Sequence, residues 1–206
     1  MPLIKGGGKA AKDSPKDAGP AAHLAALKST DADARWSAAR ALAGQASAVP
    51  ALAEALTSET APRVREAIMT ALMRVGDEAS VKAMLPCLRA DDAGVRGAAI
   101  EALQSMPDAV APFLQFLFGD SDSDVRLLAT ELARNMPEAE ATRLLCALIE
   151  NESHPNVCAA AIDVLTEVGT RDAIPALEKC AERFATTPFL PFAAKMAIAR
   201  ISGTEA

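Results

Sequence analysis

The chain has 206 residues, of which 50% are hydrophobic and only 3% aromatic, and it carries a formal net charge of −6. The acidic balance argues against nucleic acid as a partner, because nucleic-acid-binding proteins usually carry a basic face. No apolar stretch is long enough for a transmembrane helix, and the N-terminus lacks the apolar core of a secretory signal. We therefore expect a cytoplasmic protein without a membrane partner. Ala and Leu, both strong helix formers, dominate the apolar residues and favour an all-α fold.

The first predicted segment, residues 1–20, is a tail rich in Gly and Lys. Three consecutive glycines, Gly6 to Gly8, favour a flexible chain. The alternative is a docking arm in which Leu3 and Ile4 bind an apolar groove. Residues 203–206 are expected to form a short C-terminal tail, so that the folded part spans 21–202.

From residue 21 the chain repeats itself about every 30 residues. The equivalent positions, each the first residue of an apolar helical stripe, are Ala34, Val64, Val95, Val125 and Val157, and a degenerate sixth copy begins near Leu190. A fixed period of this length is typical of a solenoid.

Each repeat predicts two helices, which we call helix A and helix B. Asp and Ser residues precede helix A as caps, and Gly44, Gly76 and Gly169 end helices. Pro50, Pro112 and Pro175 are expected in the first turn of helix B, where proline costs no hydrogen bond. The A helices are predicted at 32–43, 62–75, 93–105, 123–135, 155–168 and 188–202. The B helices are predicted at 46–57, 78–89, 107–118, 138–150 and 171–184, with an unpaired B helix at 20–28.

This pattern, Asp-x-x-Val-Arg-x-x-Ala-Ala-x-Ala-Leu followed by a Pro-bearing helix, resembles HEAT repeats. More narrowly, it is similar to the short HEAT-like repeats also found in phycobilin lyase subunits. The resemblance covers residues 21–202. It implies a right-handed α-solenoid of about five to six helix pairs, in which the B helices line the concave side.

Arginine recurs at one position of successive A helices, and aspartate lies four residues before it in three repeats. A guanidinium group suits partly buried carboxylate pairing. We expect an Asp–Arg ladder that holds the repeats in register, and the alternative is a row of anion-binding arginines. The ladder residues are Arg35, Arg65, Arg96, Arg126, Asp31, Asp92 and Asp122.

The cysteines and histidines do not form a recognisable catalytic or metal-binding set. Cys87 and Cys180 fall at inward positions of B helices and are expected to be small core residues. Cys146, Cys158 and Cys180 lie in adjacent predicted helices but lack close ligand spacing. No nucleophile–base set or phosphate-binding loop is present. We expect reduced thiols, no cofactor, no metal and no enzymatic activity.

The six phenylalanines are concentrated in two places. Phe113 and Phe116 are i,i+3 neighbours at helix-B positions that are polar in other repeats, which predicts an exposed pair; the alternative is that they fill a gap between repeats. Phe118 is expected in the core. The others, Phe184, Phe189 and Phe192, are expected to close the last repeat.

We interpret the chain as a protein–protein interaction scaffold or adaptor whose partner is another protein or enzyme complex. The alternatives are an accessory subunit that matures another protein or its cofactor, as the phycobilin lyases do, and a nucleic-acid binder. The predicted partner-binding residues are Phe113, Phe116, Glu54, Lys82, Arg89, Arg143 and Lys179, with Glu150 and Glu178 beside them.

Overall fold

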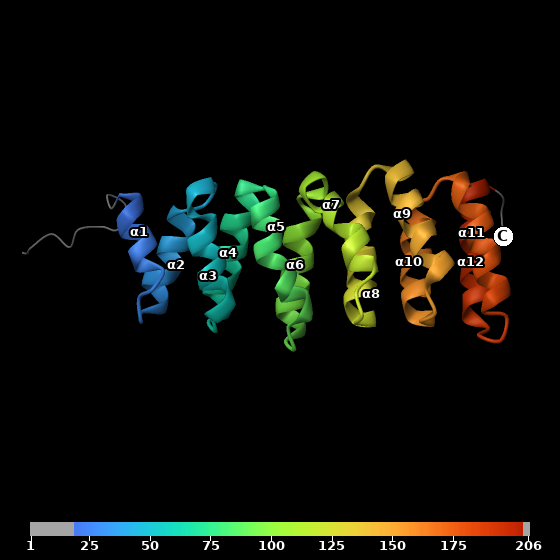
Figure 1. Cartoon of the computed structure of the whole chain (residues 1–206), viewed down its shortest axis with the longest axis horizontal. Helices are drawn as coiled ribbons and strands as arrows, with labels where there is room; N and C mark the ends of the chain where they lie inside the picture. The colour runs from blue at the N-terminus through green and yellow to red at the C-terminus, as the bar shows by residue number, and fades with distance from the viewer. Residues whose placement is uncertain (1–18, 204–206) are drawn as a thin grey trace, which may run out of the picture.

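The computed structural model describes residues 19–203, and these residues form twelve α-helices and four short 3-10 helices without any strand. The helices stand side by side in an elongated row, with α1 at one end and α12 at the other (Figure 1). This arrangement confirms the predicted all-α solenoid. Five helix pairs lie between an unpaired α1 and an unpaired α12, as the repeat pattern predicts.

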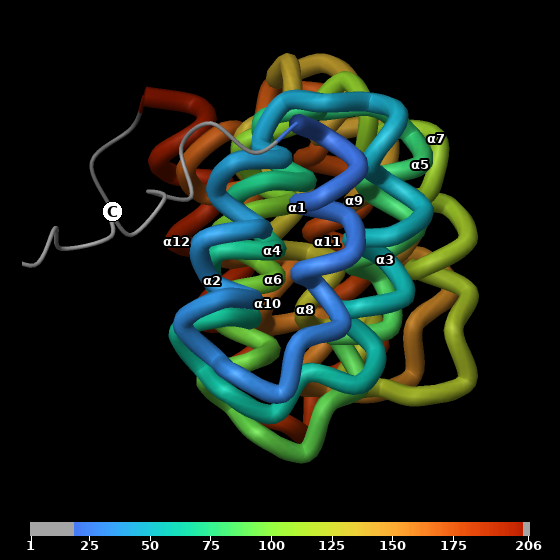
Figure 2. The backbone as a smooth tube through the Cα atoms, turned by 90° about the vertical axis from the view of Figure 1, so that its left-hand side faces the viewer, coloured from blue at the N-terminus to red at the C-terminus, as the bar shows by residue number. Residues whose placement is uncertain are grey.

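The helices form two layers, which are visible when the row is viewed along its length (Figure 2). Layer A holds the first helix of each pair, and consecutive A helices pack against one another: α2 (Ala32–Ala41), α4 (Pro62–Val75), α6 (Ala93–Gln104), α8 (Ser123–Leu132), α10 (Pro155–Val168) and α12 (Phe189–Ser202). Layer B holds α1 (Pro20–Ala26), α3 (Val49–Ser58), α5 (Glu78–Met84), α7 (Pro107–Phe118), α9 (Glu138–Asn151) and α11 (Ile174–Arg183).

Several predicted helices contain a 3-10 segment at one end. The helix predicted at 78–89 changes from α5 to a 3-10 helix over Leu85–Arg89, because Pro86 has no N–H to continue the α-helical ladder. Pro50 and Pro175 do lie in first turns. Pro112 does not: α7 begins at Pro107, so Pro112 lies inside the helix, and that part of the prediction is wrong. The other 3-10 segments are Ala46–Ala48, Ala133–Asn135 and Arg171–Ala173.

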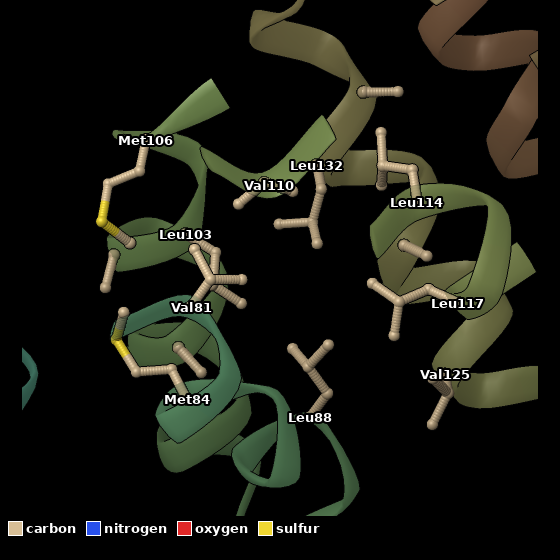
Figure 3. Packing of buried hydrophobic residues seen from close by; sticks show 14 of the residues in the cluster. Val81, Met84, Leu88, Leu103, Met106, Val110, Leu114, Leu117, Val125 and Leu132 are labelled. Carbon is tan, nitrogen blue, oxygen red and sulfur yellow. The ribbon is translucent and has the colours of Figure 1, made fainter. Parts of the chain in front are cut away.

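The core lies between the two layers and is built from small and branched aliphatic side chains. Figure 3 shows buried side chains of this core from α5, α6, α7 and α8, among them Met84, Leu103 and Leu114. Alanine recurs three residues after the ladder position in five of the six helices of layer A, and α4 has Ile68 there. Those alanines are all buried: Ala38, Ala99, Ala129, Ala161 and Ala194.

Candidate protein-binding face

The two phenylalanines of α7 that were predicted as a pair differ in exposure. Phe116 is 72% exposed. Phe113 is half-buried against the core, and the Lys82 Nζ of α5 lies 5.6 Å from the centre of its ring. Phe116 therefore projects from layer B into solvent, while Phe113 lies one turn away on α7 and is partly buried against the core. A cation over the ring face is a favourable contact, and it holds Lys82 beside the pair.

Phe118 is not a core residue, which corrects the prediction from the sequence. It is half-buried and lines a cavity of about 510 Å³ between the C-terminal ends of α7 and α9. Leu148 contributes an apolar wall there, while Gln115 and Arg143 contribute polar ones. The large ring occupies a position filled by leucine in other repeats, and the open space beside it leaves one edge accessible.

The charged residues predicted for this face occupy different settings. Within residues 19–203, the ion-pair contacts of Lys82 and Arg143 are 4.0 Å ones to Glu78 and Glu140 of their own helices, and both side chains are exposed. They flank α7 on α5 and α9, so Phe113, Phe116, Lys82 and Arg143 lie on three neighbouring B helices.

The remaining predicted partner-binding residues lie outside that group. Glu54 on α3 pairs with Lys28 at 3.0 Å, and Lys179 on α11 lies 3.9 Å from Glu150. Arg89 instead pairs with the buried carboxylate of Asp120 and lies 4.0 Å from Asp122. Because Asp120 belongs to the next repeat, Arg89 links two repeats.

The recurrent arginines hold the loops that connect the repeats, but through partners other than those expected. Arg35 donates Nη1 to the carbonyl oxygens of Ser29 and Thr30, at 2.8 and 3.2 Å. Its Nε and Nη2 donate to the two carboxylate oxygens of Glu59, at 2.7 and 3.0 Å. Glu59 lies in the following repeat, so this fork joins two repeats.

Arg126 repeats that geometry near the other end of the array. It donates to the carbonyl oxygens of Asp120 and Ser121 and to both carboxylate oxygens of Glu152, at 2.6 and 3.0 Å. The carboxylates of Glu59 and Glu152 are almost fully buried. Such charge-assisted double bonds fix both distance and orientation between neighbouring repeats.

The aspartates predicted as ladder partners cap helices instead. Each carboxylate of Asp31, Asp92 and Asp122 accepts a hydrogen bond from the N–H two residues later, at 2.8 to 3.0 Å. A carboxylate committed to the first turn of its own helix does not reach the arginine side chain, and that part of the ladder prediction is corrected. The ion-pair contact of Asp122 within the described part of the chain is with Arg89 rather than Arg126.

The ladder is incomplete in the middle of the array. Among the described residues, the Arg65 side chain donates only to the carbonyl oxygens of Glu59 and Thr60, and that of Arg96 only to those of Ala90 and Asp91. In the repeat that follows Arg65, the position of Glu59 and Glu152 is occupied by Ala90, which offers no carboxylate.

The roles of buried Glu59 and Glu152 were not predicted, because each ladder arginine was expected to pair with the aspartate four residues before it. A second signal was available. Both glutamates lie two residues before a helix cap, and each also accepts the N–H two residues later, at 2.8 and 2.7 Å. Asp120 does the same at 2.9 Å. An acid at this recurrent position marks the inter-repeat contact.

Two buried cysteines replace the ladder at the C-terminal end. Cys158 occupies the arginine position of α10, and its thiol donates to the carbonyl oxygen of Glu152, with 3.6 Å between sulfur and oxygen. Cys180 on α11 is also buried, and its neighbours Cys158 and Arg183 lower the pKa of its thiol. The Arg183 side chain lies 3.9 Å from the Cys158 sulfur and donates to the carbonyl oxygens of Ile149 and Glu150. Arg183 thus supplies a guanidinium group near the position that Cys158 leaves without one.

The other two thiols have different surroundings. Burial raises the pKa of Cys87, and burial together with nearby Glu150 and Asp172 raises that of Cys146 to about 11. Cys87 is half-buried rather than a full core residue, which corrects its predicted placement. Within residues 19–203 no cluster of three or more metal-ligating side chains occurs.

The C-terminal phenylalanines do not close the last repeat in the way predicted. Phe184 packs against the core, but Phe189 and Phe192 are 48% and 65% exposed on α12. Over the same described range, no helix is both long and apolar enough to cross a membrane.

Comparison with known proteins supports the repeat architecture. The model of the HEAT repeats family matches residues 20–104 and 110–185. Since that is more than half of the sequence, the chain belongs to the HEAT repeat family. No curated protein matches the chain.

Solved structures with a similar chain trace include the complex of CpcE and CpcF of phycocyanin lyase from Nostoc sp. PCC7120. It is 22% identical, covers 86% of this chain and 74% of that chain, and has a TM-score of 0.49. A designed armadillo repeat protein in complex with the peptide (KR)4 is 15% identical, with coverage of 88% and 98% and a TM-score of 0.42. An engineered protein is 20% identical, with coverage of 89% and 96% and a TM-score of 0.42.

Proposed function

We propose that this HEAT-repeat protein is a non-enzymatic scaffold or adaptor that binds another protein on its layer-B face. The observation that carries the proposal is the exposure of Phe116, a large aromatic side chain that is 72% exposed on the central helix α7. Exposed aromatic residues surrounded by polar ones are typical anchors of protein interfaces.

The surroundings of Phe116 favour a partner with an apolar side chain flanked by acidic groups. Lys82 and Arg143 lie on either side of α7 with exposed side chains and only weak internal contacts. Charges of this kind orient a partner and select among partners more than they add affinity. Glu54 and Lys179 extend the same face toward α3 and α11, where they contribute to its outer part.

The test is partner capture with a double variant, Phe113→Ala with Phe116→Ala. Truncating a central aromatic anchor costs about 2 kcal/mol or more, which corresponds to a loss of roughly thirtyfold in affinity. The affinity of purified protein for each captured partner is measured by biolayer interferometry, with helicity checked by circular dichroism.

The matched control is Phe189→Ala with Phe192→Ala. These residues have the same chemistry and the same i,i+3 spacing, and they are exposed on α12, outside layer B. The proposal predicts that this variant retains wild-type affinity. Equal loss in both double variants, or loss only in the α12 variant, would refute the assignment of the face.

A further inference from the structure

Layer A contains a cavity whose polar lining is cationic and free of carboxylates. It has a volume of about 440 Å³ and lies between α2 and α4, close to the start of the array. Arg40 and Arg74 line it together with His23, Trp36, Ser37 and Thr70. The cavity is on the opposite layer from Phe116, so it is a separate site.

The guanidinium groups of Arg40 and Arg74 have no hydrogen bond or ion pair with any residue between 19 and 203. Both arginines are exposed, and both line the same cavity without a carboxylate beside them, although the chain has 27 acidic and 21 basic residues. Arg40 is nevertheless held in place, because its guanidinium carbon lies 4.5 Å from the centre of the Trp36 ring. Arg63 packs on the same ring at 3.9 Å, but its charge is already paired with Asp33.

In the same layer, another arginine, Arg134, lies between α8 and α10, and it has carboxylate partners. Arg134 pairs with Glu131 and Asp163, at 3.2 and 3.1 Å, and with Glu167. Glu131 and Asp163 lie five residues after the ladder position of their repeats. At that position α2 carries Arg40 and α4 carries Thr70. Carboxylates of the chain therefore neutralise Arg134 between α8 and α10. The cavity between α2 and α4, by contrast, has no carboxylate in its lining.

We propose that the cavity between α2 and α4 binds a phosphomonoester dianion. Two guanidinium groups match its two charges, and each can donate two parallel hydrogen bonds to its oxygens. The hydroxyl groups of Ser37 and Thr70 can donate to the remaining oxygen. A single carboxylate brings one negative charge to two guanidinium groups, so the doubly charged group matches the site better. This inference goes beyond the proposed scaffold function and does not depend on it.

The test is isothermal titration of the full chain with three probes at constant ionic strength, because exposed charges are screened by salt. The probes are inorganic phosphate, the peptide acetyl-Ala-phosphoserine-Ala-amide and adenosine monophosphate. All three carry the anion, and the tightest binder identifies its source as the free ion, a phosphorylated protein or a nucleotide. The unphosphorylated peptide and adenosine are expected not to bind.

Two variants locate the site. Arg40→Gln with Arg74→Gln should weaken the binding of every probe by about tenfold or more. Thr70→Glu places in the cavity the kind of carboxylate that Glu131 and Asp163 supply to Arg134, and it should abolish binding while keeping the chain folded. The matched control is Arg200→Gln on α12, an exposed arginine outside the cavity, which should bind like the wild type.

The proposal is overturned if none of the probes binds at millimolar concentration. It is equally overturned if binding does not require the phosphate group, or if Thr70→Glu and the double arginine variant bind like the wild type. Since none of these variants touches α7, failure here leaves the assignment of the Phe116 face intact, and failure of that face leaves this site intact.

Discussion

Glu59 combines three structural contacts in one buried side chain. Its carboxylate accepts two hydrogen bonds from Arg35 and one from the N–H of Ala61, at 2.8 Å. One residue thus joins two repeats and shapes the loop before α4. Replacing Glu59 by Gln, which has a similar volume, keeps part of these contacts, whereas replacing it by Ala removes all of them.

Glu59→Ala should lower the free energy of unfolding by about 3 kcal/mol, because Arg35 is left partly buried without its partner. Glu59→Gln keeps an acceptor for Ala61 and should cost less. Urea denaturation followed by circular dichroism measures both. The control Glu54→Ala removes an exposed ion pair and should change stability by less than about 1 kcal/mol. Equal effects of Glu59→Ala and Glu54→Ala would contradict the account.

The same contact predicts an acid-dependent loss of stability. The Arg35 hydrogen bond lowers the pKa of Glu59 from its ordinary value of 4.5. A carboxyl group whose folded-state pKa is lowered contributes stability above its unfolded value, and that contribution is lost as the pH falls through the folded value. The free energy of unfolding should therefore fall below pH 4.5, and less steeply in Glu59→Gln than in the wild type. Parallel pH profiles of the two proteins would refute this role.

At the scale of the helix, replacing glycine by alanine is predicted to change stability in opposite directions at two positions. Gly97 lies inside α6, and a Cβ there would meet nothing within 4 Å. Gly169 ends α10, and a Cβ there would clash with the backbone carbonyl of Leu165. Since glycine costs a helix interior about 1 kcal/mol relative to alanine, Gly97→Ala should stabilise the protein. Gly169→Ala should destabilise it, because the backbone must shift.

Thermal unfolding by calorimetry distinguishes these two glycine variants. The midpoint should rise by a few degrees for Gly97→Ala and fall for Gly169→Ala, since about 1 kcal/mol moves the midpoint of a domain this size by roughly 2 to 4 °C. Changes of the same sign in both variants would show that backbone freedom, rather than the space beside each glycine, determines the outcome.

The helices themselves were predictable from the sequence because the same spacing of apolar and helix-ending residues occurs in each repeat. The 30-residue period predicted the five helix pairs and also the unpaired first and last helices. Finer features depended on tertiary contacts. Pro86 marked a change to 3-10 geometry, while Pro112 lies inside a continuous helix, and local sequence alone does not separate these cases.

The candidate site was only partly predictable for a related reason. Alignment of repeats identified Phe116 as exposed because equivalent residues are polar. The same alignment placed Phe118 in the core with leucines, although its ring lines the cavity between α7 and α9. Partners of the ladder arginines lie 24 and 26 residues further along the chain, so a search within one repeat did not find them.

At the scale of the whole molecule, stability depends on contacts between neighbouring repeats. The Arg35–Glu59 and Arg126–Glu152 forks strengthen the two ends, and Ala90 leaves the middle without an equivalent. A cavity of about 360 Å³ lies beside Arg65 and Ala90 and has room for a longer side chain. The central junction is therefore the place where the array can be reinforced.

Ala90→Glu should supply the missing carboxylate to Arg65 and stabilise the array by about 1 kcal/mol or more. Urea denaturation measures the gain, and the double variant Ala90→Glu with Arg65→Gln tests its origin, since it should lose the gain. The benefit is expected despite Asp91 and Asp92 nearby, because Asp92 is committed to capping α6. A gain that survives removal of Arg65 would show that another contact is responsible.

The central claim is that this repeat protein binds another protein through the exposed aromatic surface of α7. Its most direct test places a photo-crosslinking amino acid at position 116 or, as the matched exposed position, at 192, and irradiates cells that express either protein. The account predicts that position 116 becomes linked to a defined partner protein and that position 192 does not. Crosslinking to that partner from 192 alone, or equally from both positions, would contradict it.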